Sequence, residues 1–195
     1  MRFNVSEITE LIKSRRTITP ENFSDRVIHK EVLNNLLNAG IWAPNHGKTQ
    51  PWRFKIYREQ GKEQLKELYT NAYKELTPPH LYQESKATRI ASRIDKSSAI
   101  VMLNMVRQEE EKIPEIEEIQ AVGICAQNIM LMASAYGIGC FWSSPKFIYN
   151  KAFNKTVGIN EKDHCLGLLF LGYAPGEWPK GQRKPVEYLS EWIEE

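Results

Sequence analysis

A run without charged side chains, Ile119–Pro145, limits most strongly what this chain can fold into. Its first part, about residues 119–136, is long enough for a helix that Gly137 and Gly139 would end. Polar residues interrupt this first part and argue against a membrane span: Gln120, Gln127, Asn128 and Ser134. A helix without charges is buried on all sides, either inside a domain or between subunits.

Apolar periodicity predicts the elements around this helix. Residues spaced along one helical face predict further helices, and alternating or continuous apolar residues predict strands. The helices are expected at 4–14, 29–39, 60–76 and 147–157, and the strands at 52–57, 99–106 and 166–173. Helices come first, and strands separated by helical segments follow. This order predicts an α+β sandwich with a mixed sheet.

The length and composition indicate one domain. The chain has 195 residues, of which 42% are hydrophobic, enough for one core. We take residues 1–195 as a single domain, with part of 78–118 as a lid or connector. Residues 80–97 are polar, basic and expected to be helical in part, whereas 108–118 is a charged excursion expected to be solvated.

Charge, cysteines and motifs exclude several classes of protein. A net charge of +2 is too small to indicate a nucleic-acid surface. Cys125, Cys140 and Cys165 form no CxxC pair, which favours buried, reduced thiols in a cytosolic protein over metal-binding or catalytic ones. The N-terminus lacks the apolar core of a signal peptide. We therefore expect a cytoplasmic protein with no nucleic-acid, membrane or metal partner. Dinucleotide, P-loop, zinc and serine-hydrolase motifs are missing.

Polar groups gather in three places, the first of which is Ser14-Arg15-Arg16-Thr17 at the end of the first predicted helix. Two arginines there favour the helix dipole, which is a structural interpretation. The functional interpretation is anion capture, because a guanidinium fork matches phosphate oxygens and the hydroxyl adds a donor. Taken alone, this cluster favours the structural interpretation.

The second place is the segment 41–54, IWAPNHGKTQPWRF. Pro44 and Pro51 fix its backbone, while His46, Lys48 and Gln50 supply donors and acceptors. It is either a rigid loop that holds the edge of the sheet or the lining of a site for a flat polar ligand.

The third place combines FWSSP at 141–145 with the basic PKGQRKP at 179–185. Ser143 and Ser144 are also good helix caps, and the basic residues are also compatible with a solvated tail. Together the three clusters offer a phosphate end and a middle for a flat ring, which is what a flavin nucleotide needs.

The motifs resemble, in the same order, those of the FMN-dependent nitroreductase family. SRRT is similar to its RRS phosphate-binding motif, and APNHGKTQPWRF to its AP…N.QPW.F loop. The helix AVGICAQNIMLMASAYGIGCFW is similar to its central dimer helix, and LGLLFLGYAP with KGQRKP resembles its last strand and basic C-terminal segment. Four motifs in register, over most of the chain, carry the resemblance. It is closest to the compact YdjA-like subgroup.

The resemblance implies a three-layer sandwich, a mostly antiparallel sheet and an intertwined homodimer with FMN at its interface. The residues implied at the phosphate and part of the ring edge are Arg15, Arg16, Thr17 and Arg183, with Lys180 or Lys184 nearby. The residues implied along the ring are Trp42 and His46 from the partner subunit, Lys48, Gln50, Trp142, Ser143 and Ser144. Trp52 would instead anchor its strand.

The sequence departs from the family pattern at three positions. Thr17 replaces a serine and keeps the hydroxyl, a usual arginine is missing from TITPENF, and Lys48 replaces the loop asparagine. The last two changes alter hydrogen bonding to the ring. Lys48 also joins Arg15 and Arg16 as a cation that could stabilise negative charge at the ring.

The implied activity is an NAD(P)H-dependent oxidoreductase in which FMN carries the chemistry, so no catalytic side chain is expected. NADH or NADPH would pass a hydride to flavin N5. A small-molecule acceptor, such as a nitro compound or a quinone, would then receive two electrons. The alternatives are dehalogenation or flavin breakdown on the same scaffold, a flavin-binding or interaction protein without turnover, and a weak nucleic-acid binder. The small net charge argues against the last.

Overall fold

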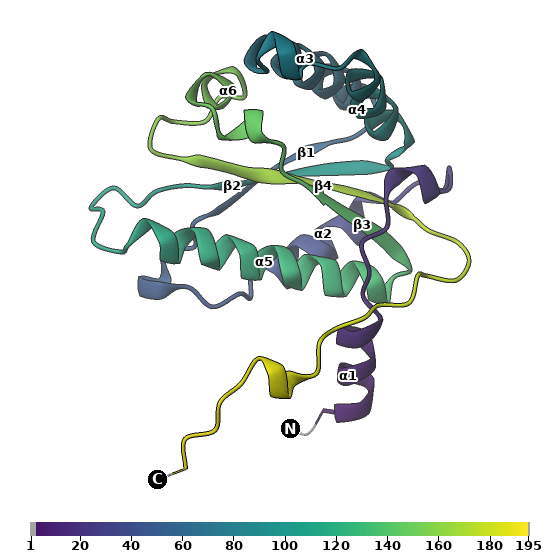
Figure 1. Ribbon diagram of the computed structural model, residues 1–195, viewed down its shortest axis with the longest axis vertical. Coiled ribbons are helices and arrows are strands. Elements are labelled where there is room, and N and C mark those ends of the chain that lie inside the picture. Colours follow the sequence, from purple (N-terminus) through teal and green to yellow (C-terminus); the bar gives the residue numbers. More distant parts are fainter. Residues whose placement is uncertain (1–2, 195) are drawn as a thin grey trace.

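The computed structural model describes residues 3–194. At its centre lies a four-stranded sheet in the order β1-β2-β4-β3 (Figure 1). The strands are β1 (Trp52–Tyr57), β2 (Ala99–Met105), β3 (Ile138–Ser143) and β4 (His164–Tyr173). All three strand pairs are antiparallel, and an isolated bridge between Thr17 and Cys140 adds a parallel pairing beside β3. The predicted mixed, mostly antiparallel sheet is confirmed in this form.

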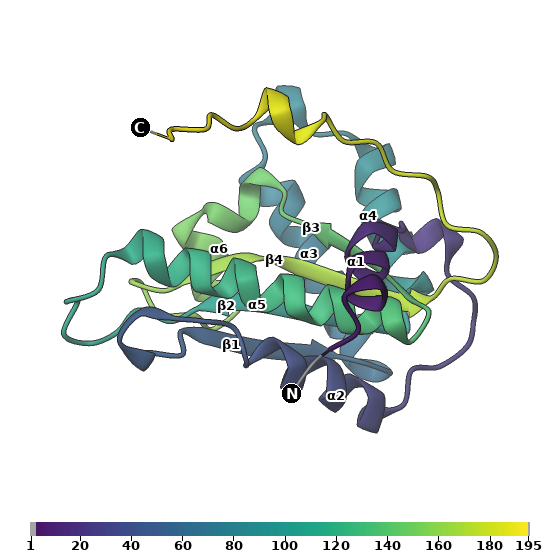
Figure 2. The ribbon, with the colours of Figure 1, turned by 90° about the horizontal axis from the view of Figure 1, so that it is seen from below.

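Helices cover both faces of the sheet and make three layers (Figures 1 and 2). One face carries α2 (Lys30–Gly40) and α5 (Glu115–Ala135), and the other carries α3 (Gln60–Leu76), α4 (Glu84–Lys96) and α6 (Lys151–Thr156). Each face has its own cluster of buried residues. Short 3-10 helices lie in the connections: η1 (Pro20–Asn22), η2 (His46–Lys48), η3 (Pro79–Leu81), η4 (Lys146–Tyr149) and η5 (Val186–Tyr188). The predicted sandwich is confirmed.

The charge-free sequence forms most of α5, which packs on α2 and the sheet. Val122, Ala126 and Ile129 are fully buried. Gly40 of α2 lies so close that a Cβ there would stand 2.7 Å from Ile129 Cγ1, so glycine lets the two helices approach. Another side of α5 is exposed to solvent, because Ile116, Ile124 and Met132 on that side are 58%, 42% and 36% exposed. A single chain therefore does not bury this helix on all sides.

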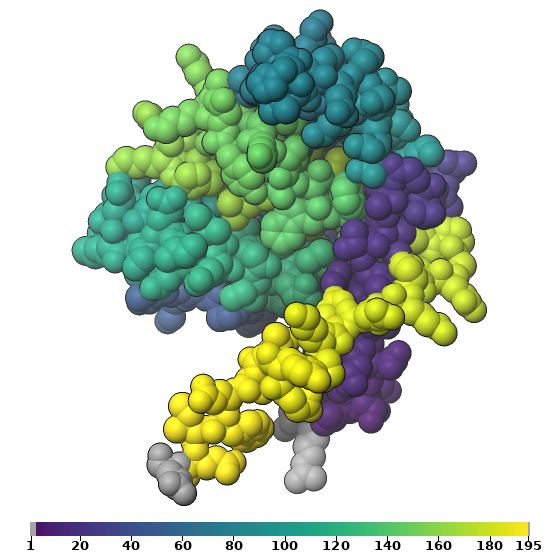
Figure 3. Space-filling view, viewed as in Figure 1, coloured from purple at the N-terminus to yellow at the C-terminus, as the bar shows by residue number. Residues whose placement is uncertain are grey.

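Helix α1 (Val5–Ser14) and the C-terminal segment, residues 175–194, project from the body (Figures 1 and 3). The Asn4 side chain caps α1 by accepting from the backbone N–H of Ser6 at 3.0 Å. Both segments expose large apolar side chains: Val5, Ile8, Ile12, Val186, Tyr188, Leu189, Trp192 and Ile193. Such surface on two neighbouring projections is typical of segments that pack on another chain.

Most predicted elements agree with the structure to within two residues, namely those at 4–14, 29–39, 52–57, 60–76, 99–106 and 166–173. Strand β3 was not predicted, because Gly137 and Gly139 were read as helix terminators. The helix expected at 147–157 is divided into η4 and α6, joined at Asn150, whose side chain caps α6. Within residues 3–194, no helix is long and apolar enough to cross a membrane.

The charged excursion 108–118 was wrongly expected to be solvated throughout. Helix α5 begins at Glu115, earlier than predicted, so the last acidic residues form its first turn. Glu118 is 1% exposed and pairs with Arg107, while its other oxygen accepts from the Gln108 backbone N–H at 3.3 Å. Acidic side chains at a helix N-terminus interact favourably with the helix dipole, which explains the early start.

Candidate functional site

Arg16 joins the first polar cluster to the basic C-terminal segment. Its Nε donates to the carbonyl of Pro179 at 2.8 Å, and its Nη1 donates to the carbonyl of Lys13 at 2.6 Å. A Cβ at Gly181 would lie 2.5 Å from the Arg16 guanidinium, so the glycine permits the contact. The structure thus brings SRRT and PKGQRKP together. The predicted phosphate site needs these two segments to lie close to each other.

The cations around this junction have no acidic partner. Arg15, Lys180, Arg183 and Lys184 form no ion pair with any residue between 3 and 194. The Arg183 side chain donates to the neighbouring carbonyl of Gln182 at 2.7 Å. Arg16 is occupied by backbone carbonyls, whereas Arg15 has no side-chain hydrogen bond within the described chain. Of the two arginines, Arg15 is therefore the one whose donors are available to an anion.

The chain after these arginines runs along the outer edge of β3. Ile18 N–H donates to the carbonyl of Cys140 at 3.0 Å, and Thr17 forms the parallel bridge with the same residue. Burial raises the pKa of the Cys140 thiol to about 12, although the charge of Arg15 acts in the opposite direction. Arg15 and Thr17 therefore lie beside the strand that carries Trp142 and Ser143.

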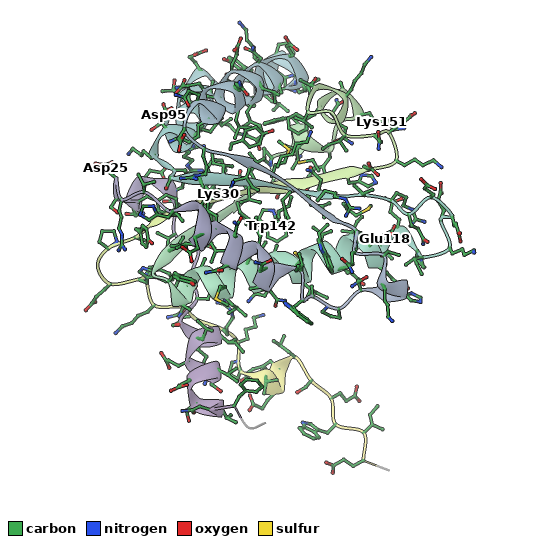
Figure 4. All side chains as sticks on the ribbon, turned by 180° about the vertical axis from the view of Figure 1, so that it is seen from behind. Asp25, Lys30, Asp95, Glu118, Trp142 and Lys151 are labelled. Atoms are coloured by element: carbon green, nitrogen blue, oxygen red, sulfur yellow. The ribbon has the colours of Figure 1, made fainter. Side chains whose placement is uncertain are left out.

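Trp142 faces its own chain at the end of β3. Its indole N–H donates to the carbonyl of Leu166 at 3.0 Å, and its ring lies against Gly167, where a Cβ would come within 2.3 Å of Nε1. Figure 4 labels Trp142 between the sheet and α5. Its side chain is committed to packing, so the backbone and the two serines after it are what this segment offers a ligand.

Ser143 and Ser144 do not cap the following helix. The N-cap position of η4 is Pro145, without a side-chain cap, and α6 is capped by Asn150. Ser144 is exposed and Ser143 is half-buried. The capping interpretation of these serines is wrong.

The loop at 41–51 has an unusual backbone. Gly47, Lys48 and Gln50 have φ of 62°, 55° and 45°. For a residue with a side chain this left-handed region is sparsely populated and costs about 1 kcal/mol or more. The Asn45 side chain holds the turn by accepting from the Gln50 backbone N–H at 2.9 Å. Two strained, non-glycine residues in one short loop are typical of a functional site.

This loop rests on the first turn of α5. His46 Nδ1 lies 2.6 Å from a carboxylate oxygen of Glu117, and Gly47 packs against Ile113. Trp42 is 85% exposed, and its contact with a partner subunit stays a prediction. Trp52 is 5% exposed, and its predicted role as the anchor of its strand is confirmed.

One chain does not bring all predicted site residues together. The loop at 41–51 sits at the first turn of α5, whereas Thr17 pairs with Cys140, in the strand that follows the other end of that helix. The 21 residues of α5 rise about 30 Å. A hollow of about 410 Å³ between α3 and α6 contains none of the predicted site residues. Within one chain the two groups of predicted site residues therefore stay apart.

The sequence analysis missed a basic cluster on α4. Lys86, Arg89 and Arg93 line a small cavity together with Ser143 and the buried Tyr69. Their spacing of three and four residues places them on one helical face, and this spacing is the signal that could have identified them. The segment 80–97 was described by its overall charge instead.

Known proteins of one family resemble this chain in sequence and in fold. A model of the nitroreductase family matches residues 12–173, which is most of the chain. The chain belongs to the nitroreductase family. A solved nitroreductase-like family protein from Bacillus cereus has a TM-score of 0.84 and 28% identity, with both chains covered fully. An FMN-dependent nitroreductase, NfnB of Mycobacterium smegmatis, solved with NADPH, has a TM-score of 0.75 and 17% identity, covering 98% of this chain and 100% of its own, and shows the fold alone.

Curated relatives cover nearly the whole chain. YfhC of Bacillus subtilis, described as "Putative NAD(P)H nitroreductase", is 27% identical over 92% of this chain and 90% of its own. YdjA of Escherichia coli K12, with the same description, is 26% identical over 84% of this chain and 86% of its own. The predicted resemblance to the family is confirmed, and membership of the YdjA-like subgroup stays a prediction.

Proposed function

We propose that this protein is an NAD(P)H-dependent oxidoreductase that binds FMN and passes two electrons to nitro compounds, quinones or similar acceptors. The observation that carries the proposal is the Arg16 junction, which places unpaired cations from both ends of the chain beside the edge of β3. Support also comes from relatives described as NAD(P)H nitroreductases and from a similar fold solved as an FMN-dependent nitroreductase.

The donor set fits the phosphate of FMN. Arg15 has free guanidinium donors, Thr17 adds an exposed hydroxyl, and Arg183 with Lys180 or Lys184 adds charge. A phosphate takes up such donors through charge-assisted hydrogen bonds. Arg16 would act mainly by holding α1 and the C-terminal segment in place, because its donors are shared among backbone carbonyls.

The ring would lie past the end of β3, along Trp142, Ser143 and Ser144. The loop at 41–51 of the partner subunit would close it, with Trp42 and His46 on the wall and Lys48 and Gln50 beside the ring. Support for a homodimer comes from the separation across α5 and from the open apolar side of that helix. The exposed apolar side chains of α1 and the C-terminal segment add to it.

When bound, FMN would supply the hydride-accepting and hydride-donating ring. The residues of this chain would bind the phosphate, orient the ring against β3 and exclude water with Trp42. Cations near the ring would stabilise the negative charge that it gains on reduction, and Arg15, Arg16 and Lys48 are the candidates. No side chain is required as an acid or nucleophile.

Titration of the protein with FMN tests the phosphate site, with flavin fluorescence as the readout. We expect Arg15→Ala to raise the Kd of FMN by about tenfold to a hundredfold, the range for losing a hydrogen bond to a charged group. Lys151→Ala is the matched control, because Lys151 is an exposed cation on α6 that pairs with Glu161. An unchanged Kd in Arg15→Ala would remove Arg15 from the site.

A further inference from the structure

The basic face of α4 lines a small cavity beside the end of β3. The cavity has a volume of about 70 Å³. Its walls are Tyr69, Lys86, Arg89, Ile90, Arg93, Ser143, Pro145 and Phe170. Lys86, Arg89 and Arg93 share one face of the helix, so their charges converge on the same space. Ser143 belongs both to this cavity and to the segment proposed to run past the flavin ring.

The positive charge of this cavity is only partly neutralised. Arg93 pairs with Glu21 at 2.7 Å and lies 4.7 Å from the ring centroid of Phe141. Lys86 lies 5.2 Å from the ring centroid of Tyr73, a contact that leaves its charge intact. Arg89 forms no ion pair or side-chain hydrogen bond with a residue in the described range 3–194, and it is exposed. The three cations of the cavity therefore have one carboxylate partner among the described residues, that of Glu21.

A buried donor opens into the same cavity. Tyr69 is 1% exposed, and its hydroxyl forms no hydrogen bond of regular geometry with a described residue, although the Ser143 side chain lies near it. Burial raises the pKa of Tyr69 well above its usual range, so the hydroxyl keeps its proton and can donate. An unpaired buried hydroxyl is unfavourable, and a ligand oxygen in the cavity would satisfy it.

We propose that this cavity binds the anionic group, a carboxylate or a phosphate, of a molecule that exchanges electrons at the site. The inference rests on the proposed function. A cavity of about 70 Å³ has room for a carboxylate or phosphate group. Ser143 places that group next to the proposed flavin ring, with the rest of the molecule over it. The group comes either from the 2′-phosphate of NADPH or from an acidic acceptor.

Steady-state kinetics of the holoenzyme with matched pairs of reactants test the proposal. The donor pair is NADPH and NADH, and the acceptor pair is 4-nitrobenzoate and its methyl ester. In Arg89→Gln, we expect kcat/KM for the member that carries the additional anionic group, in at least one pair, to fall by about three- to tenfold relative to the member that lacks it. A fall in the donor pair identifies a phosphate, and a fall in the acceptor pair identifies a carboxylate. Lys74→Gln, an exposed cation outside the cavity, should change neither ratio.

Tyr69→Phe separates binding from folding. It keeps the ring packing on Phe147 and Phe153 and removes only the unpaired hydroxyl. We expect the same loss of selectivity as in Arg89→Gln with no fall in Tm, whereas a purely structural hydroxyl would lower Tm and leave selectivity unchanged. Unchanged ratios for both pairs in both variants, in protein that retains FMN and turns over, overturn this inference alone. Failure to bind FMN overturns the proposed function instead.

Discussion

At the scale of single residues, Lys48 combines two unusual properties. Its φ of 55° lies in the left-handed region, and it stands where the resemblance places an asparagine. Asparagine adopts this backbone conformation more readily than lysine does. A lysine at this position therefore costs some stability, and we propose that its charge acts on the flavin. The sequence identified the position, but the strained backbone is visible only in the structure.

Lys48→Asn separates the charge from the backbone. We expect the variant to fold and bind FMN, and to show a lower flavin midpoint potential and a roughly tenfold slower reduction by NAD(P)H, because a cation near the ring is lost. Lys48→Arg, which keeps the charge, is the control and should stay close to the native protein. Potentiometry and stopped-flow absorbance measure both. A native potential and rate in Lys48→Asn would show that the charge points into solvent.

At the scale of elements, the start of α5 depends on a buried ion pair. The side chains of Arg107 and Glu118 are 9% and 1% exposed. The backbone N–H of Arg107 also donates to a carboxylate oxygen of Asp163 at 2.9 Å. No pattern in the sequence indicated this pairing. Glu118 lies in a charged run, and burial of one residue of such a run depends on tertiary contacts that periodicity does not report.

Glu118→Gln should lower the free energy of unfolding by about 3 kcal/mol, because Arg107 would keep a buried charge without its partner. Urea denaturation at neutral pH measures the change. Glu110→Gln is the matched control, since Glu110 pairs with Lys112 in an exposed position and should matter little. A loss below about 1 kcal/mol in Glu118→Gln would contradict a structural role for the pair.

The contact between η1 and α4 gives a pH-dependent contribution to stability. Partial burial acts to raise the pKa of Glu21, but hydrogen bonds from Arg93 and Thr19 outweigh it and lower the pKa from 4.5 to about 2. A lowered pKa means that the contribution is present above about pH 4.5 and is lost as the pH falls towards 2.

Thermal unfolding of the native protein and of Glu21→Gln between pH 6 and about pH 2 tests the direction of this pH dependence. We expect the native protein to have the higher Tm at pH 6 and the difference to vanish by about pH 2. The pair should contribute little to the free energy of unfolding, at most about 1 kcal/mol. The Glu21 side chain is 39% exposed, so solvent screens the pair. A difference that grows as the pH falls would contradict the assignment.

Several elements were predictable because their pattern is local. Helices α1, α2 and α3 and strands β1, β2 and β4 follow apolar periodicity and turn residues. Strand β3 was missed because its glycine-rich start looks like the end of α5, and its pairing partner β4 lies far along the chain. The basic face of α4 was missed because its role depends on Tyr69 and Ser143, which only the fold brings near.

At the scale of the whole molecule, the separation across α5 makes the proposed site a property of two chains. Each chain would offer Arg15 and the end of β3 to one site and its loop at 41–51 to the other. The sequence suggested both groups, and their distance within one chain became visible in the structure. The proposal is therefore a homodimer with two equivalent sites.

Mixing two defective variants tests this sharing. Arg15→Ala damages the phosphate side, and the double variant Trp42→Ala/His46→Ala damages the loop side. Mixed one to one and allowed to exchange subunits, they should form heterodimers with one intact site, restoring about a quarter of the native sites. The FMN-bound fraction measures this, with each variant alone as the control. No gain on mixing would mean that each site lies within one chain.

The central claim is that the protein binds FMN and is reduced through it by a nicotinamide donor. The most direct measurement is the visible absorbance of the purified protein under anaerobic conditions, before and after addition of NADPH or NADH. The proposal predicts a yellow protein that releases FMN on denaturation, bleaches with at least one donor and recovers its colour when a nitro compound or quinone is added. A colourless protein that takes up no added FMN, or a yellow one that neither donor bleaches, would contradict it.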